Sequence, residues 1–359
     1  MPLFRHSGFG AGAAAAGALV SLLLLHPAIA AQARDTLPPS LSNQEFWALT
    51  EQLSEPDGYF RSSSGSPDNL LSNENQVSTV AGALAERAKP SGVYLGVGPE
   101  QNFTYIAAMR PRIAFITDIR RGNLHLHLMY KALFEMSSDR ADFVGRLFSR
   151  KRPADLPATP SAAELMGWYL QVIPGTEETF KANLKAIVDH LTKTRGFPLG
   201  ADDIAGIEYV YGNFYRFGPD INYTSSINGR SGSGSSYARI VSAIDSATGQ
   251  ERTYLATETN FDLVKALHTR NLIVPVVGDF AGPKALRAVG AYLKARGATV
   301  AAFYVSNVES YLHRNGVWGQ FCGNVSNLPL DADSVFIRPG GRGSSFSPMV
   351  AETAQCHAS

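Results

Sequence analysis

The chain has 359 residues, of which 45% are hydrophobic and 18% are charged. This composition allows a sizeable hydrophobic core and excludes a largely disordered chain. With 32 basic and 31 acidic side chains, the net charge of +1 gives no electrostatic reason to expect nucleic acid or an anionic membrane surface as a partner.

The first thirty residues have the organisation of a secretory signal peptide. Arg5 and His6 precede an apolar run over residues 11–25, and small residues lead to a predicted cleavage point after Ala30. The run is short for a membrane-spanning helix, and no cysteine follows it to carry a lipid. We therefore expect an exported protein, periplasmic or secreted, without a stable membrane anchor after signal cleavage. Its mature chain, 31–359, is expected to form a single α/β Rossmann-like domain.

Two short helices, over residues 43–53 and 76–88, are predicted to precede the first strand. The residues between them, 54–74, are rich in Ser, Gly, Pro, Asp and Asn, and they predict a loop over the surface. After the second helix the chain becomes apolar at residues 93–95, which form the first predicted strand.

A glycine turn follows this strand and is typical of nucleotide-binding α/β units. Gly96 and Gly98 allow a sharp turn into a helix, and the apolar run 113–116 then predicts a buried parallel strand. Asp118 ends that strand, 20 residues beyond Gly98, the spacing at which a carboxylate meets a ribose hydroxyl. Gln101 occupies the place of the third glycine of a dinucleotide fingerprint, so a simple structural turn, with Asp118 as a helix cap, is the alternative interpretation.

Beyond the second strand the pattern predicts a helical and aromatic-rich insertion over about residues 123–250. Helices are expected at 123–134, 139–148, 162–172 and 177–194, a strand at 207–211, and a Gly/Ser-rich loop at 226–236. Further strands are then expected at 253–256, 272–277 and 299–305, with helices at 261–268 and 283–293, and residues 307–313 are expected to turn away from the last strand. This alternation predicts a Rossmann-like α/β fold, with a mainly parallel sheet and helices on both faces.

Residues that directly follow the strands of a parallel sheet gather at one edge, where ligands bind. The cofactor-binding candidates are therefore Gly96, Gly98, Glu100, Asn102, Asp118 and Arg120. The catalytic candidates follow later strands and are Asp279, Asn307 and Glu309. A carboxylate at this edge can bind ribose or amino groups, or act as a base where burial raises its pKa. Helix capping is the alternative role for Asn307, and interaction with a helix dipole is the alternative for Glu309.

Other chemistry-bearing residues give weaker signals. His125 and His127 lie two residues apart on a predicted helix and point to different faces, so we expect no metal site. In an oxidising compartment Cys322 and Cys356 predict one disulfide that ties down the C-terminal tail, with two free thiols as the alternative. The sequence has no G-x-S-x-G or G-x-x-x-x-G-K-[ST] motif, which counts against serine hydrolases and nucleoside triphosphatases.

Four segments together resemble a known family. LGVGPEQNFTYI, ITDIRRGN, VPVVGDFAGP and AFYVSNVESYL resemble an uncharacterised family of exported bacterial proteins whose core is similar to class I S-adenosylmethionine-dependent methyltransferases. The resemblance covers most of the mature chain, including the DNLLSNE segment. It implies that the methionine part of the cofactor lies against the turn from Gly96 to Gly98 and that the ribose hydroxyls bind Asp118. The turn is less glycine-rich than in many methyltransferases, and there is no Asn-Pro-Pro-Tyr-like motif.

We consider three hypotheses for the function of this protein, each of which involves a small-molecule ligand. The first is an S-adenosylmethionine-dependent methyltransferase-like enzyme of unknown substrate. The second is an exported binding protein for a nucleoside-like ligand on a non-catalytic scaffold, because S-adenosylmethionine is made in the cytosol. The third is a hydrolase that uses Asp279 or Glu309 as a general base.

Overall fold

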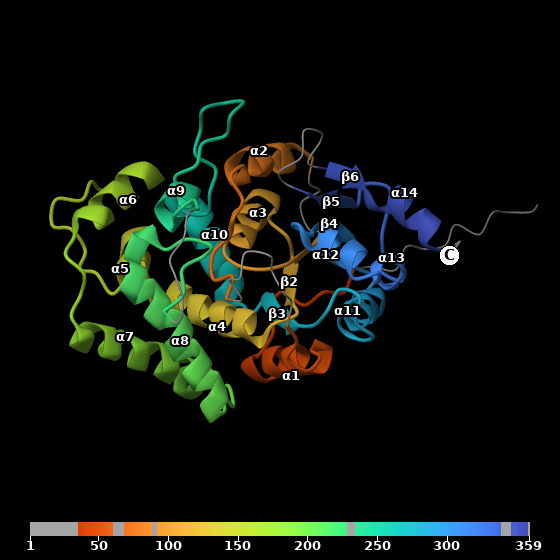
Figure 1. Ribbon diagram of the computed structural model, residues 1–359, viewed down its shortest axis with the longest axis horizontal. Helices are drawn as coiled ribbons and strands as arrows, with labels where there is room; N and C mark the ends of the chain where they lie inside the picture. The colour runs from red at the N-terminus through yellow and green to blue at the C-terminus, as the bar shows by residue number, and fades with distance from the viewer. Residues whose placement is uncertain (1–34, 60–67, 88–91, 228–233, 339–345, 358–359) are drawn as a thin grey trace, which may run out of the picture. The chain divides into compact units, whose positions relative to one another are not determined.

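The computed structural model describes residues 35–59, 68–87, 92–227, 234–338 and 346–357, and a six-stranded sheet organises them (Figure 1). The strands are β1 (Val93–Gly96), β2 (Ile113–Asp118), β3 (Ile273–Val277), β4 (Val300–Tyr304), β5 (Val335–Ile337) and β6 (Phe346–Pro348). Their order is β3-β2-β1-β4-β5-β6, in which neighbouring strands are parallel except for the antiparallel pair β5 and β6. The predicted Rossmann-like α/β fold is confirmed, and the predicted signal peptide, 1–30, lies outside the described residues.

The central strands are buried because both faces of the sheet are covered. Every residue of β1, β2 and β3 is buried, as expected for parallel strands with an apolar run rather than an alternating pattern. In β1, Leu95 pairs with Phe115 of β2 on one side and with Phe303 of β4 on the other. The chain therefore changes direction across the sheet at β1, and the carboxyl ends of β1 and β4 form the switch point where ligands bind in such sheets.

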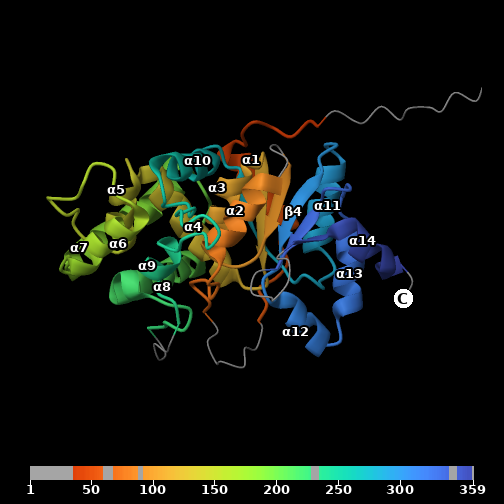
Figure 2. The same ribbon diagram turned by 90° about the horizontal axis from the view of Figure 1, so that it is seen from above.

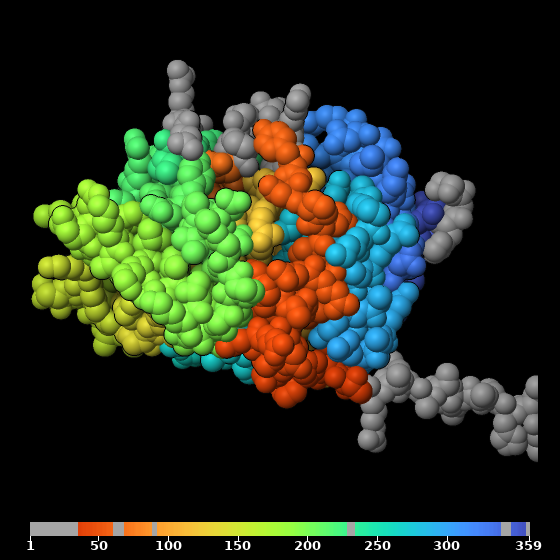
Figure 3. Space-filling model, turned by 90° about the horizontal axis from the view of Figure 1, so that it is seen from below, coloured from red at the N-terminus to blue at the C-terminus, as the bar shows by residue number. Residues whose placement is uncertain are grey.

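Helices cover both faces (Figure 2). One side carries α2 (Val77–Arg87), α3 (Gln101–Met109), α4 (Arg121–Met136) and α10 (Glu258–Thr269). The other carries α11 (Ala285–Lys294) and α13 (Trp318–Ser326), while α1 (Asn43–Leu53) packs against the edge strand β3 and against α11. In Figure 3, α1, in red-orange, lies between green residues of the segment that connects α4 to α10 and light-blue residues near α11.

The connection from β2 to β3 contains the predicted helical insertion. Between α4 and α10 it holds α5 (Arg140–Leu147), α6 (Ala162–Gln171), α7 (Glu177–Asp189), the π-helix η1 (His190–Thr194), α8 (Ala201–Phe217), the 3-10 helix η2 (Gly218–Asp220) and α9 (Tyr237–Val241). Since α4 packs on β2 and β3, the added layer consists of the helices that follow it, with α5, α7 and α8 packed on α4. Part of the Gly/Ser loop, 228–233, lies outside the described residues.

Two predicted strands in and after this segment are wrong. Residues 207–211 belong to α8, because Ile207, Val210, Tyr211 and Phe214 follow the spacing of one helical face and are all buried. Residues 253–256 form a turn before α10, in which the amide of Ala256 donates to the carbonyl of Thr253. A short apolar run does not distinguish a strand from a helix or a buried turn.

Aromatic side chains fill the space between α3, α4 and the turn before α10. The ring of Phe103 meets Tyr130, Phe134 and Tyr254 edge-on, with centroids 5.1, 5.3 and 5.5 Å apart. Edge-to-face pairs of this kind stabilise a core by about 0.5–1.5 kcal/mol each beyond the burial of their area. They hold α3, the helix that follows the glycine turn, against the helical layer.

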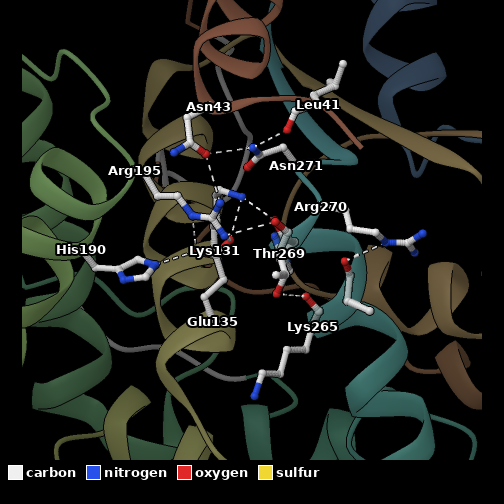
Figure 4. Close-up of polar contacts among 12 residues, drawn as sticks. Leu41, Asn43, Lys131, Glu135, His190, Arg195, Lys265, Thr269, Arg270 and Asn271 are labelled. Atoms are coloured by element: carbon white, nitrogen blue, oxygen red, sulfur yellow. Dashed lines mark hydrogen bonds and ion pairs between the residues drawn. The ribbon is translucent and has the colours of Figure 1, made fainter. Parts of the chain in front are cut away.

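A buried group of charged side chains links α4 to η1 and α1 (Figure 4). Nζ of Lys131 lies 2.8 Å from Oε1 of Glu135, and the same carboxylate is contacted by His190 at 2.6 Å and by Arg195 at 2.7 Å. Nη1 of Arg195 also donates to Oδ1 of Asn43 at 3.0 Å. Glu135 therefore serves as a shared partner for the ammonium group of Lys131, the guanidinium group of Arg195 and the ring of His190.

The C-terminal segment is attached by a disulfide and by ion pairs. Cys322 of α13 is bonded to Cys356 of the terminal 3-10 helix η3 (Ala354–His357), which confirms the predicted pairing. A loop of this size is expected to contribute about 4 kcal/mol in the chain-entropy picture. Arg338, just beyond β5, pairs with Glu309 of α12 (Val308–Arg314) and with Glu352 of α14 (Met349–Thr353).

In the described ranges, every helix is too short or too polar to cross a bilayer. These ranges also contain no group of three or more His, Cys, Asp or Glu side chains arranged to hold a metal ion. His125 and His127 instead face separate partners, Asp203 at 2.9 Å and the carbonyl of Gly98 at 2.9 Å.

Candidate functional site

A cavity of about 570 Å³ lies at the carboxyl ends of β1, β2, β3 and β4. Its walls come from the turn after β1, the end of β2, the loop after β3, the loop after β4, and α12. Of the sequence-predicted site residues, four line it: Gly98, Asp118, Asp279 and Asn307. The cavity has the size of a small-molecule site and lies at the switch point of the sheet.

The glycine turn is held from below by two buried side chains. Gly98 has φ of 75°, a left-handed conformation that favours glycine. Nδ2 of Asn102 donates to the carbonyls of Val97 at 2.9 Å and Pro99 at 2.8 Å, and Nε2 of His127 donates to the carbonyl of Gly98. Burial lowers the pKa of His127 to about 4, so the ring is neutral and its Nε2 carries the proton that this bond needs.

Gly96 and Asn102 act behind this turn and do not line the cavity. A Cβ at Gly96 would lie 2.0 Å from Oδ1 of Asn102, the atom that accepts a hydrogen bond from the hydroxyl of Tyr94 at 2.8 Å. The missing side chain of Gly96 therefore makes room for Asn102. Both residues position the turn, and the structure places neither in the cavity wall.

Asp118 is buried at the end of β2 and is tied to Arg120. Oδ1 of Asp118 accepts from Nε of Arg120 at 3.0 Å, and Oδ2 accepts from Nη2 at 3.1 Å. Nη1 of Arg120 donates to the carbonyl of Asp68. Arg120 thus orients the carboxylate and joins it to the segment before α2, and it is not itself part of the cavity wall.

Asp279 follows β3 and faces the cavity from a capped loop. Its Oδ1 accepts from the amide of Ala281 at 2.9 Å, and its own amide donates to Glu55 at 3.2 Å. Glu55 also accepts from the amides of Lys284 and Ala285, each at 2.8 Å, and so caps the start of α11. The loop after β3 is therefore fixed by a residue that lies far away in sequence.

Asn307 and Glu309 separate in the structure. Asn307 precedes α12 and is exposed at the cavity, and its side chain makes no capping hydrogen bond. Glu309 lies outside the cavity wall and pairs with Arg338, whose Nη2 is 2.7 Å from Oε1 of Glu309. The structure thus brings Asn307, but not Glu309, to the place where the four strands end.

Glu100 lies beneath the turn and anchors the segment that covers it. Its carboxylate is fully buried and accepts from the amide of Ser72 at 3.2 Å. Burial raises the pKa of Glu100 to about 8, so the side chain is protonated near neutral pH. Leu70 and Leu71 are also buried, so the end of the predicted surface loop 54–74 instead packs inward against the turn.

Several cavity residues were not identified from the sequence. They come from loops, from the end of β4 and from α12, and they are Tyr59, Asn69, Ser72, Asn73, Tyr223, Tyr304, Tyr311, Arg314 and Asn315. One signal was present in the sequence, because Asn69 belongs to the quoted DNLLSNE segment and adopts φ of 46°, a conformation that asparagine tolerates. Tyr223 comes from the helical segment, and no spacing rule connects it to strand ends.

Replacing Glu100 by glutamine is expected to reduce the fall in the free energy of unfolding as pH rises from about 4.5 to about 8. The folded state retains this proton up to about pH 8, whereas the unfolded chain releases it near 4.5, so Glu100 lowers stability as pH rises between these values. Urea unfolding of the wild type and the variant at about pH 5 and about pH 8.5 measures this effect. Glu86→Gln, an exposed change on α2, is the control, and identical pH dependence in all three proteins would contradict the assignment.

Two segments of the chain, residues 70–190 and 235–357, match the model of a domain of unknown function (DUF7790). The chain belongs to the DUF7790 family. The matched part of this DUF7790 protein includes Gly98, Asp118, Asp279 and Asn307, whereas Tyr223 lies between the two segments. No curated protein matches the chain.

Proposed function

We propose that the cavity binds a nucleoside-type ligand, with S-adenosylmethionine as the candidate cofactor, and that this DUF7790 protein is an exported, methyltransferase-like enzyme of unknown substrate. One observation carries the proposal. Gly98 and Asp118, which have the sequence spacing of a nucleotide-binding unit, line the same cavity at the switch point between β1 and β4.

The residues present fit such a ligand. The turn at Gly98 is open, because the nearest atoms to a Cβ there would be 3.8 Å away, so the backbone can approach a ligand closely. Gln101 lines the cavity, and its Oε1 is buried without a hydrogen-bond partner among the described residues. A buried acceptor of this kind is satisfied when a ligand N–H or O–H reaches it.

The carboxylate of Asp118 has room to accept one hydrogen bond from a ribose hydroxyl. A carboxylate has about four lone-pair positions. The backbone amide, Nε and Nη2 of Arg120 take three of them, which leaves one on Oδ2 for a ribose hydroxyl. S-adenosylmethionine, when bound, supplies an electrophilic methyl group. The chain's own residues would hold the nucleoside and orient it through Gly98, Gln101 and Asp118.

Calorimetric titration of the mature chain with S-adenosylmethionine and S-adenosylhomocysteine tests the proposal. We expect saturable binding that Asp118→Asn weakens about 10- to 100-fold, because a charge-assisted hydrogen bond contributes about 1.5–3 kcal/mol. Asn307→Ala should weaken binding less, since its amide is exposed. Asn327→Ala, an exposed change outside the cavity, should leave affinity unchanged. No binding at millimolar ligand would reject the proposal.

A second function, ligand binding without catalysis, is favoured by the partners of the acidic candidates. Oδ1 of Asp279 accepts from Ala281, and both oxygens of Glu309 accept from Arg338. These bonds give the two carboxylates structural roles. Saturable binding of S-adenosylhomocysteine without methyl transfer to any offered acceptor would support this second function, and measured transfer would exclude it.

A further inference from the structure

A second cavity, of about 1180 Å³, adjoins the first. Residues 73–75 form one wall, and α9 with the residues that follow it forms another. Asn73 and Tyr223 line both cavities. A molecule in the second cavity would therefore lie next to a ligand in the first.

Glu74 lies at the boundary between the two cavities. It lines the second cavity, and its Oε1 accepts from the hydroxyls of Tyr304 at 2.9 Å and Ser306 at 3.1 Å, both of which line the first. Among the described residues, none donates a hydrogen bond to its Oε2. Burial raises the pKa of Glu74, and the hydrogen bonds from Tyr304 and Ser306 offset this in part.

Arg239 supplies the opposite charge in the same cavity. Its side chain on α9 is exposed, and it forms no ion pair with a carboxylate in the described part of the chain. The remaining polar side chains of this cavity are uncharged, and they are Asn73, Asn75, Tyr223, Thr224, Ser235 and Ser242. A guanidinium favours a carboxylate, whereas a carboxylate such as Glu74 favours an ammonium or hydroxyl group.

We propose that the second cavity binds a small amino acid or hydroxy acid, with its carboxylate at Arg239 and its ammonium or hydroxyl group at Glu74. This arrangement places the ligand's donor group at the boundary with the first cavity, beside Tyr304 and Ser306. With the methyl donor in the first cavity, this ligand would be the acceptor substrate, and that role rests on the proposed function. Its binding does not, and it can be measured without a nucleoside.

Saturation-transfer NMR with the mature chain tests the site, using a mixture of L-amino acids and 2-hydroxy acids as probes. We expect at least one member to bind, and its amide derivative, which lacks the carboxylate, to bind at least about tenfold more weakly. Arg239→Ala should abolish this preference for the free acid. Glu74→Gln, which keeps an acceptor for Tyr304, should weaken binding of the free acid but leave its preference over the amide derivative unchanged.

The controls separate this inference from the proposed function. Arg216→Ala removes an exposed arginine from a different groove and should leave binding unchanged. S-adenosylhomocysteine titrated into the same samples reports on the first cavity, so its failure to bind would reject the nucleoside proposal alone. No saturable binding by any probe at millimolar concentration, or a preference for the free acid that survives Arg239→Ala, would overturn the second site.

Discussion

Replacing Glu135 by glutamine is expected to lower the free energy of unfolding by about 3–5 kcal/mol, the cost of removing one partner from a buried ion pair. The side chains of Lys131 and Glu135 are only 2% and 3% exposed, so water cannot solvate the ammonium group of Lys131 when the carboxylate is removed. His190 and Arg195 contact the same carboxylate, and the variant leaves these groups facing one another without an anion. Urea unfolding monitored by circular dichroism measures the loss.

The dependence of this loss on pH gives an independent check. Burial alone would raise the pKa of Glu135, but the hydrogen bond from His190, the charge of Lys131 and the hydrogen bonds from Arg195 and Lys131 lower it to about 2. Its contribution is therefore fully present above about pH 4.5 and disappears as pH falls toward 2. The difference in the free energy of unfolding between the wild type and the variant should therefore decrease as pH falls over that interval. Glu177→Gln, in an exposed pair with Lys181, is the control and should produce no measurable deficit at any pH.

Replacing Gly96 by alanine is expected to destabilise the protein by at least about 3 kcal/mol and to abolish nucleoside binding. The new Cβ would lie 2.0 Å from Oδ1 of Asn102 and 2.8 Å from Cε1 of Tyr94, in a buried part of the sheet. Overpacking of this kind typically costs about 1–3 kcal/mol. Displacing Asn102 adds the cost of leaving buried carbonyls of the turn without donors.

Gly122→Ala is the matched control for this change. Gly122 lies in the first turn of α4, and a Cβ there would meet no atom within 4 Å. The control should be neutral or slightly stabilising, since alanine has the higher helix propensity. Thermal unfolding and titration with S-adenosylhomocysteine measure both properties for the two variants. If Gly96→Ala behaves like the control, Asn102 does not hold the turn as the geometry indicates.

Local spacing was sufficient to predict the first α/β unit. The apolar strand residues, the two glycines and the acidic residue after the second strand place β1, α3 and β2 correctly, because each element depends on neighbours in sequence. The rule that parallel strands end at one edge predicted that nine candidate residues gather there. Four of them line the cavity, namely Gly98, Asp118, Asp279 and Asn307. Long, periodic helices were also located well, as in α4 and α7.

Local spacing failed where tertiary packing decided between alternatives. The apolar residues of 207–211 suit a strand or a helix, and only packing against α4 makes them part of α8. Likewise, Glu309 follows a strand but pairs with Arg338, which directly follows β5 and is 29 residues away in sequence. Spacing also could not show that Arg120 would bind the carboxylate of Asp118 from two residues away.

Residue spacing was enough to predict the class of fold, the glycine turn and the edge of the sheet at which a ligand site would lie. The surroundings of that edge depend on long-range packing: Leu70 and Leu71 pack inward, α12 forms one wall, and Tyr223 contributes from the insertion. Strands and helices form from contacts between near neighbours in sequence, and these contacts leave a periodic pattern that can be read locally. Cavity walls form from side chains far apart in sequence, and the free energy of their packing has no local signature.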